Sequence, residues 1–122
     1  MTIDLGPRSS SFDIVVRHDL KRASIVLRGE LDVAAVARCD AAFAAVLDGD
    51  VFSLAVDLTD LTFCDSSGLR SLARGTDRCE DRGIEVRLLR PSQVVQRALR
   101  LSGLDAFLGI DPIDSLDGDD AA

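Results

Sequence analysis

Residues 52–76 read FSLAVDLTDLTFCDSSGLRSLARGT and predict a strand, a loop and a helix in direct succession. The apolar run at 52–57 is typical of a strand that is buried on both faces and lies parallel to a neighbour. The loop from residue 58 onward ends in acidic and hydroxyl residues, which favour the start of a helix at about Ser67. This stretch therefore predicts a central strand followed by a helix. The expected apolar face of that helix comprises Leu69, Leu72, Ala73 and Thr76.

The residues before this stretch predict a hairpin and a further helix. Runs rich in β-branched residues lie at 12–16 and 24–28, on either side of a polar stretch at 18–22, and favour two antiparallel strands. Asp32 stands where a helix cap is expected, and the helix should end near Gly49. Its apolar face has three- and four-residue spacing and comprises Val36, Cys39, Phe43, Val46 and Leu47.

The residues after it predict one more strand and one more helix. Residues 84–89 alternate like a strand, Pro91 occupies the position of a first helical residue, and Gly103 should close that helix. Gly75, inside the second helix, indicates either close backbone packing or a tolerated defect. The order of elements predicts an α/β fold with a mixed β-sheet of four to five strands, an antiparallel edge pair, and three to four covering helices.

The chain has 122 residues, enough for one domain with one core. We expect residues 1–11 to form a flexible N-terminal lead, because they are polar and contain glycine, proline and three consecutive serines. Residues 12–110 form the predicted domain. Residues 111–122 are rich in aspartate and poor in apolar side chains, so we expect a disordered acidic tail.

The composition argues against several kinds of partner. A net charge of −7 would repel a nucleic-acid backbone, and there is no tryptophan or tyrosine to stack on a base. We therefore expect no nucleic-acid partner. The sequence contains neither an apolar run of the roughly 18 residues that a membrane span needs nor a signal peptide. It thus predicts a cytoplasmic protein without a membrane partner. We expect a monomer or a weak dimer.

Side chains that carry catalysis or bind metals are sparse. Cys39, Cys64 and Cys79 show no metal-ligand spacing and are odd in number, which argues against a disulfide framework. We interpret Cys64 as a buried small hydrophobe, although a thiolate at a helix start could gain reactivity. His18 is interpreted as a solvated turn residue rather than a general base. Without a phosphate-binding glycine loop either, we predict no enzymatic activity, no cofactor and no metal site.

Ser66 and Ser67 allow two interpretations. In the first, Ser67 caps the helix and Gly68 lets the chain enter it tightly. In the second, Ser66 carries a phosphate that the helix N-terminus stabilises. Such a phosphate would lie beside Asp65, and on a partner surface that fits the neutral hydroxyl it would bring repulsion and a desolvation cost. Phosphorylation would then switch binding to that partner.

Two motifs resemble those of the STAS family of anti-sigma factor antagonists. One is FCDSSGL at 63–69, and the other is GELD at 29–32. The similarity extends to Asp57 at the end of the predicted central strand and to LSGL at 101–104. Together with the order of elements it covers residues 12–110, and it implies the STAS fold.

The resemblance also implies a mechanism. The unphosphorylated protein would bind an anti-sigma factor that is also a serine kinase and would thereby release a sigma factor. The kinase would inactivate the antagonist by phosphorylating Ser66, and a metal-dependent serine phosphatase would restore it. ATP and magnesium would belong to these partners. For Asp32, a plain helix cap is an equal alternative to partner contact. The expected partner-binding residues are Asp32, Asp65, Ser66, Ser67, Gly68 and Arg70.

Arg70 departs from the family pattern, in which a small residue often follows the leucine of DSSGL. It shares a helical face with Arg74, and Arg78 is a further candidate for that face. These arginines form either a solvated face or a basic strip that meets an acidic partner or holds the phosphate. Two other functions stay open. One is a non-switching STAS scaffold subunit of a larger signalling or lipid-transport assembly. The other is a small enzyme or ligand-binding domain with a pocket beside Ser66.

Overall fold

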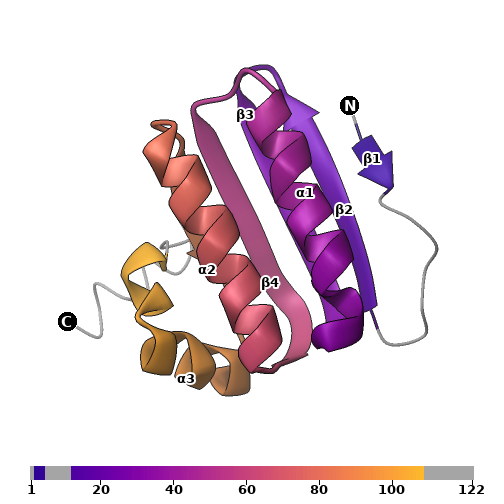
Figure 1. Ribbon diagram of the computed structural model, residues 1–122, viewed down its shortest axis with the longest axis vertical. Coiled ribbons are helices and arrows are strands. Elements are labelled where there is room, and N and C mark those ends of the chain that lie inside the picture. The colour runs from indigo at the N-terminus through magenta and orange to yellow at the C-terminus, as the bar shows by residue number, and fades with distance from the viewer. Residues whose placement is uncertain (1, 5–11, 109–122) are drawn as a thin grey trace.

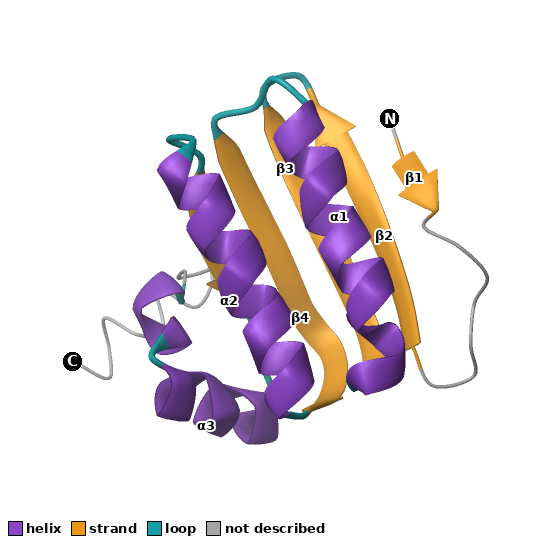
Figure 2. Cartoon of the chain, in the orientation of Figure 1, coloured by secondary structure: helices purple, strands orange, loops and turns teal. Residues whose placement is uncertain are grey.

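The computed structural model describes residues 2–4 and 12–108, in which strands lie side by side in chain order and helices pack against them (Figure 1, Figure 2). The strands of the described residues are β1 (Thr2–Asp4), β2 (Phe12–Asp19), β3 (Arg22–Leu31), β4 (Ser53–Cys64) and β5 (Glu85–Leu89). The α-helices are α1 (Val36–Asp48), α2 (Ser66–Asp81) and α3 (Gln93–Ser102). Short 3₁₀ helices are η1 (Val33–Ala35) and η2 (Leu104–Phe107).

The sheet has an antiparallel part and a parallel part. β1, β2 and β3 pair antiparallel, whereas β3, β4 and β5 pair parallel. Parallel neighbours need a crossover connection, which α1 supplies between β3 and β4 and α2 supplies between β4 and β5. The predicted α/β fold, with a mixed sheet and its antiparallel pairing at one edge, is confirmed.

β4 is twice as long as the sequence predicted. It covers 12 residues, and the prediction of a loop from residue 58 onward was wrong. The strict alternation of a strand is lost here, because Leu58, Leu61 and Cys64 are buried at intervals of three residues. The pairing with β3 contains register shifts, one of them beside Gly29, whose φ is +89°. Such bulges turn side chains three residues apart onto one face of the sheet.

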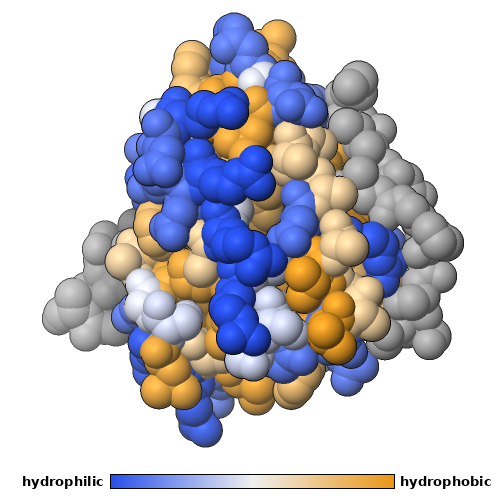
Figure 3. Space-filling model, in the orientation of Figure 1, coloured by the Kyte–Doolittle hydropathy of each residue, from blue (hydrophilic) through white to orange (hydrophobic). Residues whose placement is uncertain are grey.

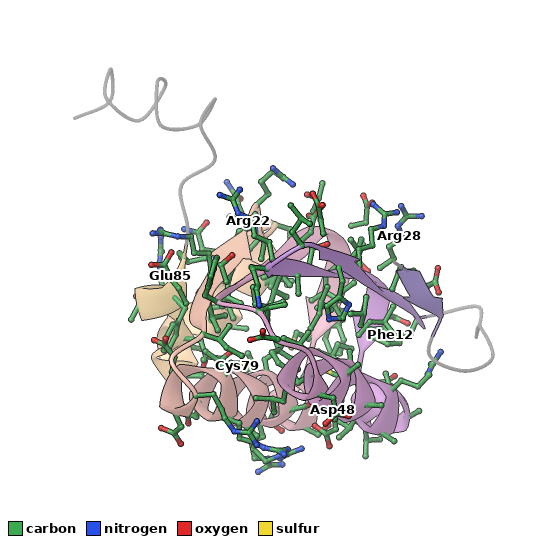
Figure 4. The ribbon with its side chains drawn as sticks, turned by 90° about the horizontal axis from the view of Figure 1, so that it is seen from above. Phe12, Arg22, Arg28, Asp48, Cys79 and Glu85 are labelled. Atoms are coloured by element: carbon green, nitrogen blue, oxygen red, sulfur yellow. The ribbon has the colours of Figure 1, made fainter. Side chains whose placement is uncertain are left out.

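α1 and α2 form one layer and the sheet forms the other, as the view from above shows (Figure 4). Residues that alternate away from the helices, such as Arg22 and Glu85, lie on the opposite face of the sheet, where Figure 4 places them. The core between the two layers includes Ile14, Val16, Ile25, Leu27, Leu54, Val56, Leu58, Val86 and Leu88.

At Gly75, α2 packs closely against α1. A Cβ atom built at this position would lie 2.2 Å from Cγ of Phe43, a side chain of α1 that is almost fully buried. The first of the two explanations predicted for Gly75, close packing, is therefore the correct one.

The ends of some elements differ from the prediction. α3 begins at Gln93 rather than Pro91, because Ser92 caps it: the Ser92 Oγ accepts a hydrogen bond from the backbone N–H of Val95 at 3.2 Å. Its end before Gly103 is as predicted. The proposed N-terminal lead contains strand β1, which pairs with β2. The rest of that lead and the predicted acidic tail, residues 111–122, lie outside the described residues.

Candidate functional site

The sequence-predicted site lies where the parallel strands β3 and β4 end side by side. Leu31 and Cys64, the last residues of these strands, are paired, and the backbone N–H of Asp65 donates to the carbonyl of Leu31 at 3.2 Å. Because both strands end at the same edge of the sheet, the segments that follow them, η1 and the first turn of α2, lie next to each other. Asp32 and Asp65, 33 positions apart in the sequence, therefore belong to one surface.

The cap of α2 is Asp65, not Ser67. Asp65 Oδ1 accepts hydrogen bonds from the backbone N–H of Gly68 at 2.9 Å and from the Ser67 hydroxyl at 2.6 Å. A carboxylate accepts two donors at once and bonds them more strongly than a hydroxyl does, which explains why it takes the cap position. The helix consequently starts at Ser66 rather than at Ser67. The Ser67 hydroxyl acts as a donor that holds the cap in place.

These hydrogen bonds set the charge state of Asp65. The Ser67 hydroxyl and then the Gly68 N–H lower the pKa of the carboxyl group below its ordinary value, and the backbone of Val33 contributes in the same direction. Asp65 is thus a stable anion at neutral pH. η1, which contains Val33, is also in contact with α2.

Ser66 is exposed at the first position of α2, and its hydroxyl makes no hydrogen bond within the described residues. Because Asp65 provides the cap and Ser67 supports it, folding makes no use of the Ser66 side chain. Positive charge at a helix N-terminus stabilises an added phosphate locally. The two serines therefore differ in role. Ser67 is structural, and Ser66 is available for chemical modification.

Gly68 allows α2 to start this close to β3. A Cβ atom at this position would lie 2.5 Å from the carbonyl oxygen of Leu31 and 2.8 Å from its Cγ. The first distance involves backbone, which cannot rotate away. Any larger residue would push the first turn of α2, with Ser66 on it, away from the end of the sheet.

Asp32 and its neighbours form the rest of this surface. The Asp32 side chain accepts a hydrogen bond from the backbone N–H of Ala34 at 3.1 Å and so caps η1, while α1 begins only at Val36.

Two apolar side chains near Asp65 are exposed, Val33 at 74% and Phe63 at 43%. Neither of them was predicted from the sequence to bind a partner. The signal that could have found Val33 is an apolar residue directly after a capping aspartate, where the chain turns outward. We call Asp32, Val33, Phe63, Asp65, Ser66 and Arg70 the docking edge.

Arg70 is exposed on α2. A hydrophilic band runs over the face of the molecule that this helix forms (Figure 3). The neighbouring Arg74 is fixed, because its Nη2 lies 3.1 Å from both carboxylate oxygens of Asp40 on α1. The buried Ser71 hydroxyl donates to the same carboxylate at 2.6 Å. The predicted strip of arginines is therefore not uniform: Arg74 joins the two helices, and Arg70 does not.

The cysteines carry protonated thiols. Burial raises the pKa of Cys64 to about 12 and those of Cys39 and Cys79 to about 11. Cys64 is thus the buried small hydrophobe that we predicted, and it is not a reactive thiolate.

His18 is not the solvated turn residue that we expected. It is half-buried in β2 and pairs with Ala23, at the other end of the sheet from Ser66.

Other features of the described residues bear on alternative functions. They contain no group of three or more His, Cys, Asp or Glu side chains that could hold a metal ion, and none of their helices is long and apolar enough to span a membrane. A hollow of about 470 Å³ lies far from Ser66, at the start of β4 and β5. Its lining comprises Arg22, Ala23, Phe52, Ser53, Leu54, Ala55, Glu85, Arg87 and Leu89.

The comparisons with known proteins agree with this geometry. A family model described as the Mlab STAS domain matches residues 14–110. The unphosphorylated form of the anti-sigma factor antagonist SpoIIAA is 25% identical, with a TM-score of 0.71, over 92% of this chain and 98% of that chain. The phosphorylated form of SpoIIAA, a cell fate determinant of Bacillus, is 26% identical, with a TM-score of 0.66, over 88% of this chain and 97% of that chain.

A third structure shares the fold at lower identity. It is an anti-sigma factor antagonist from Mycobacterium paratuberculosis, which is 23% identical, with a TM-score of 0.73, over 88% of this chain and 93% of that chain. No curated protein sequence matches the chain.

Proposed function

Because the chain belongs to the STAS domain family, we propose that it is an anti-sigma factor antagonist that binds an anti-sigma factor with serine kinase activity and is inactivated by phosphorylation of Ser66. Binding would release a sigma factor, and a metal-dependent serine phosphatase would remove the phosphate. ATP and magnesium would be bound by those partners. The chain itself would act by binding and not by catalysis.

The observation that carries this proposal is the state of the Ser66 hydroxyl. It is exposed, it is free of hydrogen bonds within the described residues, and it lies next to a cap that does not depend on it. A kinase can therefore reach this oxygen without unfolding the helix. SpoIIAA, which matches most of this chain, is known in an unphosphorylated and a phosphorylated form.

The chemistry of the docking edge supports a switch of this kind. Val33 and Phe63 offer apolar area that a partner can cover, and Asp32 and Asp65 provide fixed charges beside it. A phosphate on Ser66 adds about −1.5 to −2 charges in the middle of this surface. A partner fitted to the neutral hydroxyl would then face like-charge repulsion and an uncompensated desolvation cost. Phosphorylation would end binding without changing the fold.

Phosphorylation by the cognate kinase tests the proposal. The purified chain is incubated with the kinase and ATP, and the modified residue is located by mass spectrometry. We expect one phosphate on the wild type and on Ser67→Ala, and none on Ser66→Ala. Ser67→Ala tests whether the adjacent hydroxyl, which is bonded to Asp65, is the phosphate acceptor instead. A phosphate that stays on Ser66→Ala, or a wild type that takes none, contradicts the proposal.

The scaffold function is the second candidate, and the family model that matches, the Mlab STAS domain, is the observation that favours it. In this case the chain would be a non-switching subunit of a larger signalling or lipid-transport assembly. Co-purification separates the candidates. A stable large assembly whose formation is unaffected by Ser66→Asp supports the scaffold function, whereas a complex that Ser66→Asp abolishes supports the antagonist.

A further inference from the structure

Arg70 lies one helical turn after Ser66 on α2. Residues four apart on a helix share a face, with their Cβ atoms about 5–6 Å from each other. Both side chains are exposed. The order, with the future anion N-terminal to the cation, is the favourable one for such pairs.

Arg70 is also available for a new interaction. Within the described part of the chain, no carboxylate or carbonyl pairs with its guanidinium, whereas Arg74 binds Asp40 and Arg82 donates to the carbonyl of Leu47. The carboxylate next to Ser66, that of Asp65, is already engaged by the Ser67 hydroxyl and the Gly68 N–H.

We propose that Arg70 pairs with the phosphate group when Ser66 is phosphorylated, an inference that rests on the proposed function. A guanidinium presents planar N–H donors that match two phosphate oxygens, and charge-assisted hydrogen bonds of this kind are the strong ones. Phosphorylation then changes the docking edge in two ways. It adds negative charge at Ser66, and it withdraws the positive charge of Arg70 from a partner that approaches this surface.

The pairing makes the phosphate a weaker base. The test uses full-length protein with phosphoserine incorporated at position 66 during synthesis, and follows the second ionisation of the phosphate by ³¹P NMR. We expect Arg70→Gln to raise the phosphate pKa by about 0.2 to 0.4 relative to the wild type, from the usual strength of such pairs. Arg70→Lys should fall between the two. The difference should shrink in 1 M salt, where charges are screened within about 3 Å.

Arg78→Gln is the matched control. Arg78 is exposed on the same helix, two turns beyond Arg70, and it too has no ion-pair partner within the described residues. Its replacement removes the same charge and should leave the phosphate pKa unchanged. Asp32 and Asp65, the other charged residues of the docking edge, are present in every variant. Equal phosphate pKa values for wild type and Arg70→Gln, or equal changes in Arg70→Gln and Arg78→Gln, would overturn the pairing.

Failure of the pairing and failure of the proposed function are distinguishable, because the NMR experiment needs no kinase. If the phosphate pKa responds to Arg70 but the cognate kinase leaves Ser66 unmodified, the pairing stands and the proposed function fails. If the kinase modifies Ser66 but the phosphate pKa ignores Arg70, the function stands and the pairing fails.

Discussion

Replacing Gly75 by alanine sets two physical effects against each other. By helix propensity alone, alanine in a helix interior would stabilise the fold by about 1 kcal/mol. The new Cβ would, however, lie 2.2 to 2.5 Å from three ring carbons of Phe43, which is 1% exposed. That ring has no space to move into, so α1 and α2 must separate. Inserting a methyl group into a packed core costs typically about 1–3 kcal/mol, and the helix-propensity gain offsets about 1 kcal/mol of this cost. We therefore expect Gly75→Ala to lower the free energy of unfolding by up to about 2 kcal/mol.

Urea unfolding followed by circular dichroism measures this change, and a double-mutant cycle identifies its cause. Phe43→Leu shortens the side chain that the new methyl group would meet, at the cost of a cavity in the core. If the clash is responsible, the double variant should be more stable than the sum of the two single losses predicts. Gly75→Ala at least as stable as the wild type, or strict additivity in the double variant, would refute this account of the helix interface.

Three further predictions concern the site. Asp65 should stabilise the fold above the unfolded carboxyl pKa of about 4, and this contribution should be lost as pH falls through its lower folded pKa. Asp65→Asn, which keeps a capping oxygen, should reduce the loss of stability between pH 5 and pH 2 in urea unfolding, and an unchanged pH profile would contradict the role of the charge. Gly68→Ala should destabilise by about 1–3 kcal/mol in the same assay, because its Cβ would meet the Leu31 carbonyl, and equal stability would disprove that contact. Cys64 should react with a thiol reagent at pH 8 only on unfolding, since burial raises its pKa to about 12; rapid labelling of native Cys64, located by mass spectrometry, would contradict this.

The element order was predictable because each element has a strong local signal. Val36, Cys39 and Phe43 recur at helical spacing, and the β-branched run at 24–28 has no helical period. The length of β4 was not predictable in this way. Its second half is a strand because β3 pairs with it through register shifts, and such irregular pairing leaves no period of two in the sequence.

The candidate site, like the fold, was predictable from the sequence only in part. The sequence located Ser66 and the residues around it, but it assigned the cap to Ser67. Which side chain caps a helix depends on the backbone angles at the junction, and Asp65 has the extended conformation that a cap requires. The exposure of Val33 and Phe63 follows from the meeting of two distant chain segments at one edge of the sheet, which no local pattern records.

In the proposed function, binding to the kinase partner depends on a neutral side chain at Ser66. The most direct measurement compares the affinity of the partner for wild type, Ser66→Ala and Ser66→Asp, each shown by circular dichroism to be folded. We predict that wild type and Ser66→Ala bind alike, because both side chains are neutral and the fold does not use the Ser66 hydroxyl. Ser66→Asp should lose binding by at least about tenfold, or 1.4 kcal/mol. Equal affinity of all three forms would show that charge at position 66 does not control binding.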